Sequence, residues 1–151
     1  MQETNSAPTS DLLRGLKRMA VLNLILLSVQ GWTGDVVNLF AVFPAGAVNG
    51  FGGFFQGLGS AGPGPLATYH AIEGVVILLL GIGITVMAFQ KKAPRGVKVT
   101  SLLGLISIFA AALGGYLFVF SGFANNGNSA QMGGAFIGAY AMNFLVLYYS
   151  K

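Results

Sequence analysis

The sequence predicts an all-α fold: an integral membrane four-helix bundle with both termini in the cytoplasm. Composition is the first reason, because 54% of the 151 residues are hydrophobic and only 8% are charged. A soluble domain carries about 25% charged residues. Length is the second reason, because the chain contains four apolar stretches of the roughly 18 or more residues that a membrane-spanning helix needs. The third reason is the one-sided placement of the basic residues.

The expected elements follow one another in a simple order. Residues 1–12 form a polar N-terminal tail, and residues 13–151 form the transmembrane domain. The four helices are expected at residues 19–43, 66–89, 99–121 and 132–149. Pro44 ends the first helix, because proline has no amide hydrogen with which to continue the helical hydrogen bonds.

An external loop at residues 44–65 joins the first two helices. It is rich in glycine but also contains Phe51, Phe54 and Phe55. Two interpretations of this loop are open. It is either a cap that lies in the membrane interface or against partner subunits, or a flexible link whose aromatic residues are incidental.

The basic residues set the expected topology. All eight lysine and arginine residues lie on one side of the two predicted helical hairpins: Arg14, Lys17, Arg18, Lys91, Lys92, Arg95, Lys98 and Lys151. The positive-inside rule therefore predicts a multi-pass protein of the cell membrane, with both termini and the 90–98 link in the cytoplasm. Because topology accounts for this charge, no nucleic-acid partner is expected. The absence of cysteine excludes disulfides, iron–sulfur clusters and covalently attached c-type haem.

Three ionisable residues lie inside the predicted helices: Asp35, His70 and Glu73. Such residues are costly in a bilayer, so each one is a functional hypothesis by default. At a rise of ~1.5 Å per residue, all three lie about 25–30 Å from the basic side, in the outer third of the membrane. Together with Gln30 and Asn38 of the first helix, they predict one buried polar cluster near the outer face.

The inner half of the predicted second and third helices is poor in polar residues. It offers few polar side chains, among them Thr85, Ser101 and Ser107. A proton path across the whole membrane needs polar groups at several depths. The sequence therefore favours a single site near the outer face.

His70 and Glu73 share a helix face, because they are three residues apart. Gly74 and Gly81 lie close to the same face. A histidine above a glycine-lined stripe is a surface on which a flat porphyrin can lie, and neutral imidazole is a common haem ligand. In the alternative interpretation His70 lies near the membrane interface, hydrogen-bonded to Glu73 or Asp35, and the glycines serve helix packing.

Three stretches carry a resemblance to known proteins: "LLSVQGWTGDVVNLF", "YHAIEGVVILLLGI" and "NSAQM". They are similar to patterns in small uncharacterised four-helix membrane proteins of archaea and bacteria, whose layout resembles one half of a haem A synthase type unit. The resemblance implies that His70 is an axial ligand of haem b. The family unit supplies a second histidine from its fourth helix, and this chain has none there. Met132 lies at about that level, and it either gives a His/Met pair or is an ordinary interface methionine.

Three functions from different classes remain open. The first is a small accessory or redox-associated subunit of a membrane complex, for example a respiratory one. The second is a stand-alone b-type cytochrome with His/Met ligation, and the third is an oligomeric channel or transporter protomer. The sequence shows no nucleophile with a paired base, no phosphate loop and no HExxH motif, so it does not indicate an independent enzyme. No metal beyond haem iron is expected.

The expected partners are the lipid bilayer and either a larger membrane complex or further copies of the same chain. Gly134 and Gly138 have the spacing of a small-residue stripe on the fourth helix, which allows close helix contact. The sequence predicts that part of this glycine-rich surface faces a partner.

Overall fold

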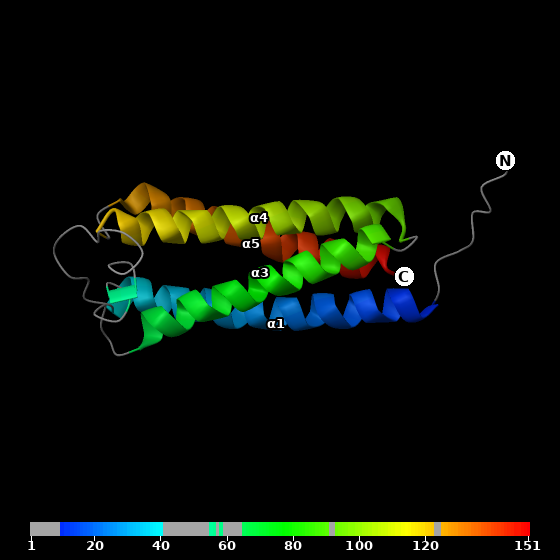
Figure 1. Ribbon diagram of the computed structural model, residues 1–151, viewed down its shortest axis with the longest axis horizontal. Helices are drawn as coiled ribbons and strands as arrows, with labels where there is room; N and C mark the ends of the chain where they lie inside the picture. Colours follow the sequence, from blue (N-terminus) through cyan, green and yellow to red (C-terminus); the bar gives the residue numbers. More distant parts are fainter. Residues whose placement is uncertain (1–9, 41–54, 57, 59–64, 91–92, 123–124) are drawn as a thin grey trace.

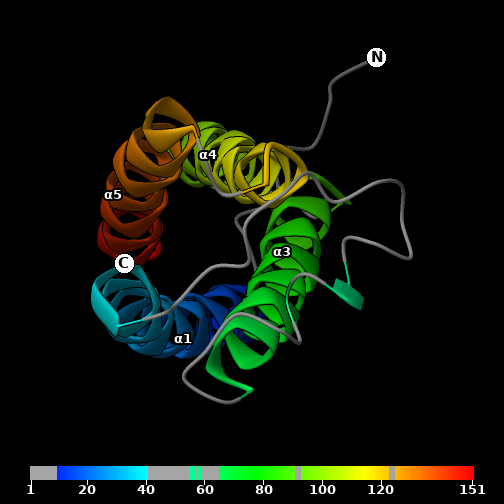
Figure 2. The ribbon, with the colours of Figure 1, turned by 90° about the vertical axis from the view of Figure 1, so that its left-hand side faces the viewer.

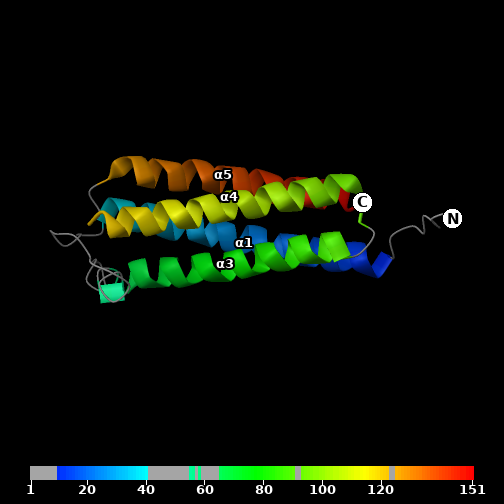
Figure 3. The same ribbon diagram turned by 45° about the horizontal axis from the view of Figure 1, so that its top comes forward.

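The computed structural model describes residues 10–40, 55–56, 58, 65–90, 93–122 and 125–151. These residues form four α-helices: α1 (Ser10–Phe40), α3 (Leu66–Gln90), α4 (Arg95–Phe120) and α5 (Asn126–Tyr149). The helices lie side by side along the length of the molecule (Figure 1, Figure 3). The predicted all-α architecture of four helices is therefore confirmed.

Each helix packs against two neighbours. Viewed along their length, the helices form a ring in the order α1, α3, α4, α5 (Figure 2). The contact between α4 and α5 is the most extensive, and glycines permit it. A Cβ atom at Gly114 would lie 3.0 Å from the carbonyl oxygen of Asn128, and one at Gly138 would lie 3.0 Å from the hydroxyl of Ser107. In a lipid environment such close backbone packing replaces the hydrophobic drive between helices.

Three of the helices begin earlier than their apolar stretches predict, and α4, which begins at Arg95 instead of residue 99, differs least. α1 begins at Ser10, well before residue 19, and α5 begins at Asn126. The side chain of Asn125 caps α5 by accepting a hydrogen bond from the amide of Gly127 at 3.0 Å. An apolar stretch marks only the part of a helix that suits lipid, so polar first turns fall outside it.

Among the described residues of the predicted 44–65 loop, Leu58 packs onto the helices, whereas Phe55 is exposed. Leu58 is buried and lies in one apolar cluster with Ala67 of α3. Phe51 and Phe54 lie outside the described residues.

Three helices are long and apolar enough to cross a membrane: Leu66–Phe89 of α3, Arg95–Phe120 of α4 and Asn126–Tyr149 of α5. α1 is not among them, because it mixes apolar residues with a basic first part and with Asn23, Gln30 and Asp35. Large apolar side chains such as Ile72 and Phe109 are exposed on the outside of the bundle, which suits contact with lipid. Membrane crossing by α1 stays a prediction.

The two ends of the bundle differ in charge. α1 begins and α5 ends at the same end (Figure 1), which we call the basic end. The described basic residues lie at this end, in the helices or, for Lys151, just after α5: Arg14, Lys17, Arg18, Arg95, Lys98 and Lys151. Lys91 and Lys92 lie outside the described residues. We call the other end, where α1 ends and α3 begins, the opposite end.

Three apolar clusters follow one another along the interior of the bundle. One lies near the basic end and one near the opposite end. Between them lies the middle apolar layer, which consists of Leu27, Ile77, Ile108 and Ala139. Buried polar side chains lie on both sides of this layer, and they supply the candidate sites.

Candidate functional site

Four polar side chains meet between α1 and α3 near the opposite end of the bundle: Gln30, Thr33, His70 and Glu73. We call this group the α1–α3 polar site. His70 lies at its centre. The Nε2 atom of His70 lies 3.1 Å from Nε2 of Gln30, and its Nδ1 atom lies 3.0 Å from Oγ1 of Thr33. Both ring nitrogens are therefore hydrogen-bonded to side chains of α1.

Glycines on the two facing helices make room for this arrangement. A Cβ atom at Gly34 would lie 2.9 Å from Cε1 of His70, so any side chain there would displace the ring. On α3, a Cβ atom at Gly74 would lie 3.3 Å from Nε2 of Gln30. Gly34 and Gly74 thus allow the imidazole and the amide to lie in the seam between the helices.

Thr33 connects His70 to a buried carboxylate. Its hydroxyl oxygen lies 3.1 Å from the carbonyl oxygen of Gln30 and 3.5 Å from Oε2 of Glu73. Thr33 is 1% exposed and Glu73 is 5% exposed. A hydroxyl has one proton to donate and two lone pairs that accept. It can therefore accept from a protonated Nδ1 of His70 and donate to Glu73 at the same time.

Two buried acceptor atoms of the site have no partner among the described residues, namely Oε1 of Gln30 and Oε1 of Glu73. A buried acceptor without a hydrogen bond costs about 1–3 kcal/mol. Rotation of the Gln30 amide would turn its oxygen towards Nε2 of His70, which donates when it carries a proton. A proton on Glu73 would turn its unpaired acceptor into a donor. The hydrogen bonds of the site can therefore be rearranged when it takes up a proton.

Charge balance leads to the same result. The ion pair between Arg14 and Asp11, at 3.7 Å, lies near the basic end, and within the described residues no lysine or arginine forms an ion pair with Glu73. A buried carboxylate without a compensating charge is strongly unfavourable. His70, which is linked to it through Thr33, is the neighbouring group that can hold the compensating proton. The arrangement can therefore bind a proton and move it between His70 and Glu73.

Asp35 and Asn38 do not belong to this site, contrary to the sequence-based prediction of buried side chains. Both are exposed on α1. Successive residues of an α-helix are rotated by about 100°. Asp35 follows Thr33 by two positions, so it points to nearly the opposite side of the helix. Of the predicted polar cluster, the structure brings together Gln30, His70 and Glu73.

The residues that the sequence suggested for haem lie in different seams of the bundle. His70 faces α1, whereas the sulfur of Met132 lies 3.2 Å from the position of a Cβ atom at Gly115 on α4. A Cβ atom at Gly81 would lie 2.8 Å from Cδ1 of Ile108, so this glycine serves packing against α4. An axial histidine needs a free ring nitrogen, and both nitrogens of His70 are engaged. The residues in this arrangement do not fit a haem.

A second buried polar pair, Asn23 and Asn143, is absent from the sequence-based predictions. Nδ2 of Asn23 donates to Oδ1 of Asn143 at 3.1 Å, and Nδ2 of Asn143 donates to the carbonyl oxygen of Ala139 at 2.9 Å. The two residues are 0% and 4% exposed. Each is a lone amide in an apolar run, "VLNLIL" or "AMNFLV", which is the signal that could have revealed them. Thr33 gives no such signal, because threonine is common in packed membrane helices.

Comparisons with known proteins add no relative. No protein-family model matches the chain, and neither a curated protein nor a solved structure is detectably similar to it. The resemblance to one half of a haem A synthase type unit therefore stays a prediction.

Proposed function

We propose that this protein is a small accessory subunit of a redox-associated membrane complex, and that its α1–α3 polar site exchanges protons with the side of the membrane at the opposite end. The observation that carries the proposal is the connection of His70 to the buried Glu73 through the Thr33 hydroxyl. In this proposal the basic end lies in the cytoplasm, so the polar site lies near the outer face of the cell membrane.

The site can take up a proton without large rearrangement. Neutral His70 accepts a hydrogen bond from the Gln30 amide at Nε2 and donates from Nδ1 to Thr33. When Nε2 is protonated, rotation of the Gln30 amide supplies an acceptor for it. The hydroxyl of Thr33 then accepts a hydrogen bond from the imidazolium and donates one to the Glu73 carboxylate. The residues around His70 therefore suit both of its protonation states.

A proton-exchanging site performs no complete reaction by itself. The electron transfer or substrate chemistry that drives the exchange must come from another protein, because the sequence shows no catalytic motif of its own. This argument supports an accessory subunit over a stand-alone cytochrome. The geometry of His70 also counts against the cytochrome, since iron binding would require one of the two ring hydrogen bonds to break.

The proposal is tested on His70 directly, because it is the only histidine in the chain. Protein labelled with ¹⁵N-histidine gives signals from this residue alone, and they report its protonation state as pH is changed. Infrared difference spectra over the same pH range report protonation of carboxyl groups. We expect the wild type to show a carboxyl band that changes together with the His70 signals.

Two matched variants complete the experiment. Glu73→Gln is expected to remove the carboxyl band and to alter the pH response of His70. Asp35→Asn removes an exposed carboxyl group of α1. It is expected to change neither the carboxyl band nor the pH response of His70. His70 signals that follow the same course with pH in Glu73→Gln and in the wild type would contradict the proposal.

A further inference from the structure

Besides Ser150 at the end of α5, five polar side chains are buried on the other side of the middle apolar layer, towards the basic end: Asn23, Thr85, Thr100, Ser101 and Asn143. We call them the inner polar layer. Asn23 precedes Gln30 by seven residues, which places the two about 10 Å apart along α1. Thr100 and Ser101 follow Lys98 within one helical turn, so this layer lies close to the basic end. The interior thus contains polar groups at two depths.

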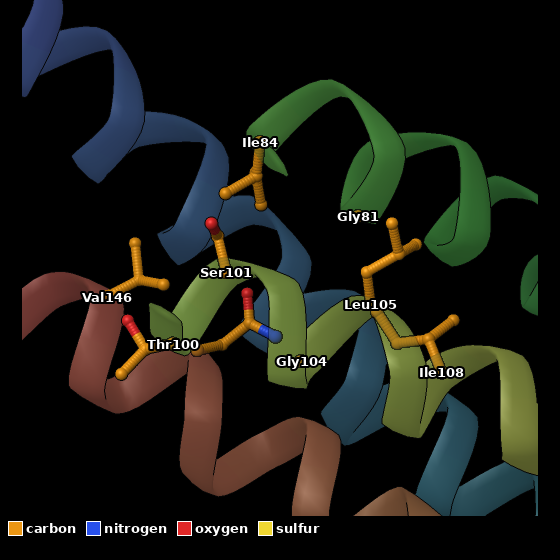
Figure 4. Close-up of a pocket in the computed structure, with 9 residues that line it drawn as sticks. Gly81, Ile84, Thr100, Ser101, Gly104, Leu105, Ile108 and Val146 are labelled. Carbon is orange, nitrogen blue, oxygen red and sulfur yellow. The ribbon is translucent and has the colours of Figure 1, made fainter. Parts of the chain in front are cut away.

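A small pocket opens in this layer between α3, α4 and α5. It is about the size of one water molecule. Its polar lining comes from Thr100, Ser101 and Asn143, and Figure 4 shows the first two beside Ile84 of α3 and Val146 of α5. A buried water needs two to four polar partners, and these three side chains meet that requirement.

The hydrogen bonds of the layer leave mainly acceptors unused. Thr100 donates its hydroxyl proton to the carbonyl oxygen of Gly96 at 2.8 Å, and Ser101 donates to that of Lys98 at 3.0 Å. Their oxygen lone pairs therefore remain free. Oδ1 of Asn23, buried in the same layer, has no partner among the described residues.

Unused amide protons of the layer complement these acceptors. Asn143 uses one of its two amide protons for the carbonyl oxygen of Ala139 and keeps the other. Its nitrogen lies 3.8 Å from the position of a Cβ atom at Gly104, which lines the pocket. A ligand that both donates and accepts suits this set, and a water molecule does so. A metal cation would leave the amide proton unpaired.

The middle apolar layer separates the inner polar layer from the α1–α3 polar site. Leu27 lies between Asn23 and Gln30 on α1, and Ile77 lies between Glu73 and Thr85 on α3. Ile108 from α4 completes the layer with Ala139 from α5. Apolar side chains cannot carry a proton, so a proton cannot pass while this layer stays dry.

We propose that the inner polar layer binds a water molecule and that, together with the α1–α3 polar site, it forms a proton path closed in this structure by the middle apolar layer. The inference rests on the proposed function, because it uses His70 and Glu73 as the outer proton site. When water enters the apolar layer, a proton passes from the outer site along water to the inner layer. It leaves at the basic end once water also enters the apolar cluster there, and the outer site then takes up another proton from outside.

The first test detects the water in the wild-type protein. In lipid bilayers, nuclear magnetic resonance measures magnetisation transfer from water to ¹⁵N-labelled asparagine side chains. The Asn143→Leu variant identifies the signal of Asn143 by its loss. We expect rapid transfer from water to the amide of Asn143, although the residue is 4% exposed. Absence of transfer to Asn143 in a folded sample would overturn the inference.

The second test measures proton flux in proteoliposomes under an imposed pH gradient. Ile108→Ser makes the apolar layer wettable and is expected to raise the flux at least about tenfold, which corresponds to about 1.4 kcal/mol in the barrier. Adding Asn143→Leu to Ile108→Ser should return the flux to the wild-type level, because the inner half of the path is lost. Ile106→Ser, a control on the same helix whose side chain is exposed on the outside of the bundle, should leave the flux unchanged.

The two tests separate this inference from the proposed function. Circular dichroism checks that each variant folds, and Ile77→Ser replaces Ile108→Ser if the latter does not. If Ile108→Ser conducts equally well with and without Asn143→Leu, the path does not run through the inner polar layer. The inference then fails, while a normal response of His70 to Glu73→Gln preserves the proposed function. A flux that requires Na⁺ and ignores the pH gradient would also overturn the inference.

Discussion

At the scale of single residues, the hydroxyl of Thr33 holds the α1–α3 polar site together. It lies within hydrogen-bonding distance of His70, of the Gln30 carbonyl oxygen and of Glu73, and it is almost fully buried. Valine has nearly the same shape as threonine but no hydroxyl. Thr33→Val therefore removes the hydrogen bonds without leaving a cavity.

We predict that Thr33→Val lowers the free energy of unfolding by about 1–3 kcal/mol, because it leaves buried polar atoms of His70 and Glu73 unpaired. Thr33→Ser keeps the hydroxyl and should retain more of the stability. Unfolding by denaturant in detergent micelles measures both variants. Equal stability of Thr33→Val and the wild type would mean that the Thr33 hydroxyl does not hold the site.

The sequence indicates His70 and Glu73 because ionisable residues stand out in an apolar run. It does not show which way they point around the helix relative to the other helices. Asp35 stands out equally, yet it lies on the exposed side of α1, and Thr33 does not stand out but is the link between the two. Helix rotation within the bundle is decided by packing between helices, and residue type alone cannot supply it.

At the scale of elements, the asparagine pair connects the first and last helices of the chain. The amides of Asn23 and Asn143 are buried between α1 and α5. In membranes a hydrogen bond between helices contributes about 0.6 kcal/mol on average and up to about 1.7 kcal/mol. A double-mutant cycle isolates this contribution from the effects of the single substitutions.

We predict a coupling of about 0.5–1.7 kcal/mol between Asn23→Leu and Asn143→Leu. The double variant should lose less stability than the two single variants lose together. Each single variant leaves an unpaired buried amide, whereas the double variant leaves none. The measurement is unfolding of the wild type and the three variants in the same micelles. Additive losses would show that the pair makes no energetic contact.

The sequence predicts the helices well because each has a long apolar core. It predicts the use of their glycines poorly. By the small-residue spacing Gly138 is a candidate contact between chains, but the structure packs it against Ser107 of α4 within the same chain. At Gly134, by contrast, no atom lies within 4 Å of the position that a Cβ atom would take. Spacing reveals a close contact but not the helix that makes it.

We therefore predict that Gly138→Leu destabilises the bundle itself, by about 1–3 kcal/mol or more, because the added side chain overpacks the α4–α5 contact. Gly134→Leu, one helical turn away and exposed, should leave the bundle intact. Thermal unfolding of the two variants measures the difference. If Gly138→Leu keeps the stability of the wild type and only dissociates an assembly, the glycine acts between chains after all.

At the scale of the whole molecule, the question is whether α1 crosses the membrane with the other three helices. Its composition does not mark it as a span, because polar residues interrupt its apolar run. Asp35 is exposed, but the other polar residues face the interior: Asn23 pairs with α5, and Gln30 and Thr33 contact α3. α1 has 31 residues, so at ~1.5 Å per residue it is about 46 Å long and exceeds the ~30 Å hydrocarbon core.

Packing along the whole bundle predicts that α1 inserts together with its partners. Four crossings place both termini on one side, whereas three crossings by α3, α4 and α5 alone would place them on opposite sides. By the positive-inside rule, the basic residues at the end where α1 begins predict that this side is cytoplasmic. We predict that reporters fused before Met1 and after Lys151 both report the cytoplasm. Reporters on opposite sides would contradict four crossings. If both reporters instead lay outside, the four crossings would hold but the orientation would be reversed. The α1–α3 polar site would then lie near the cytoplasmic face.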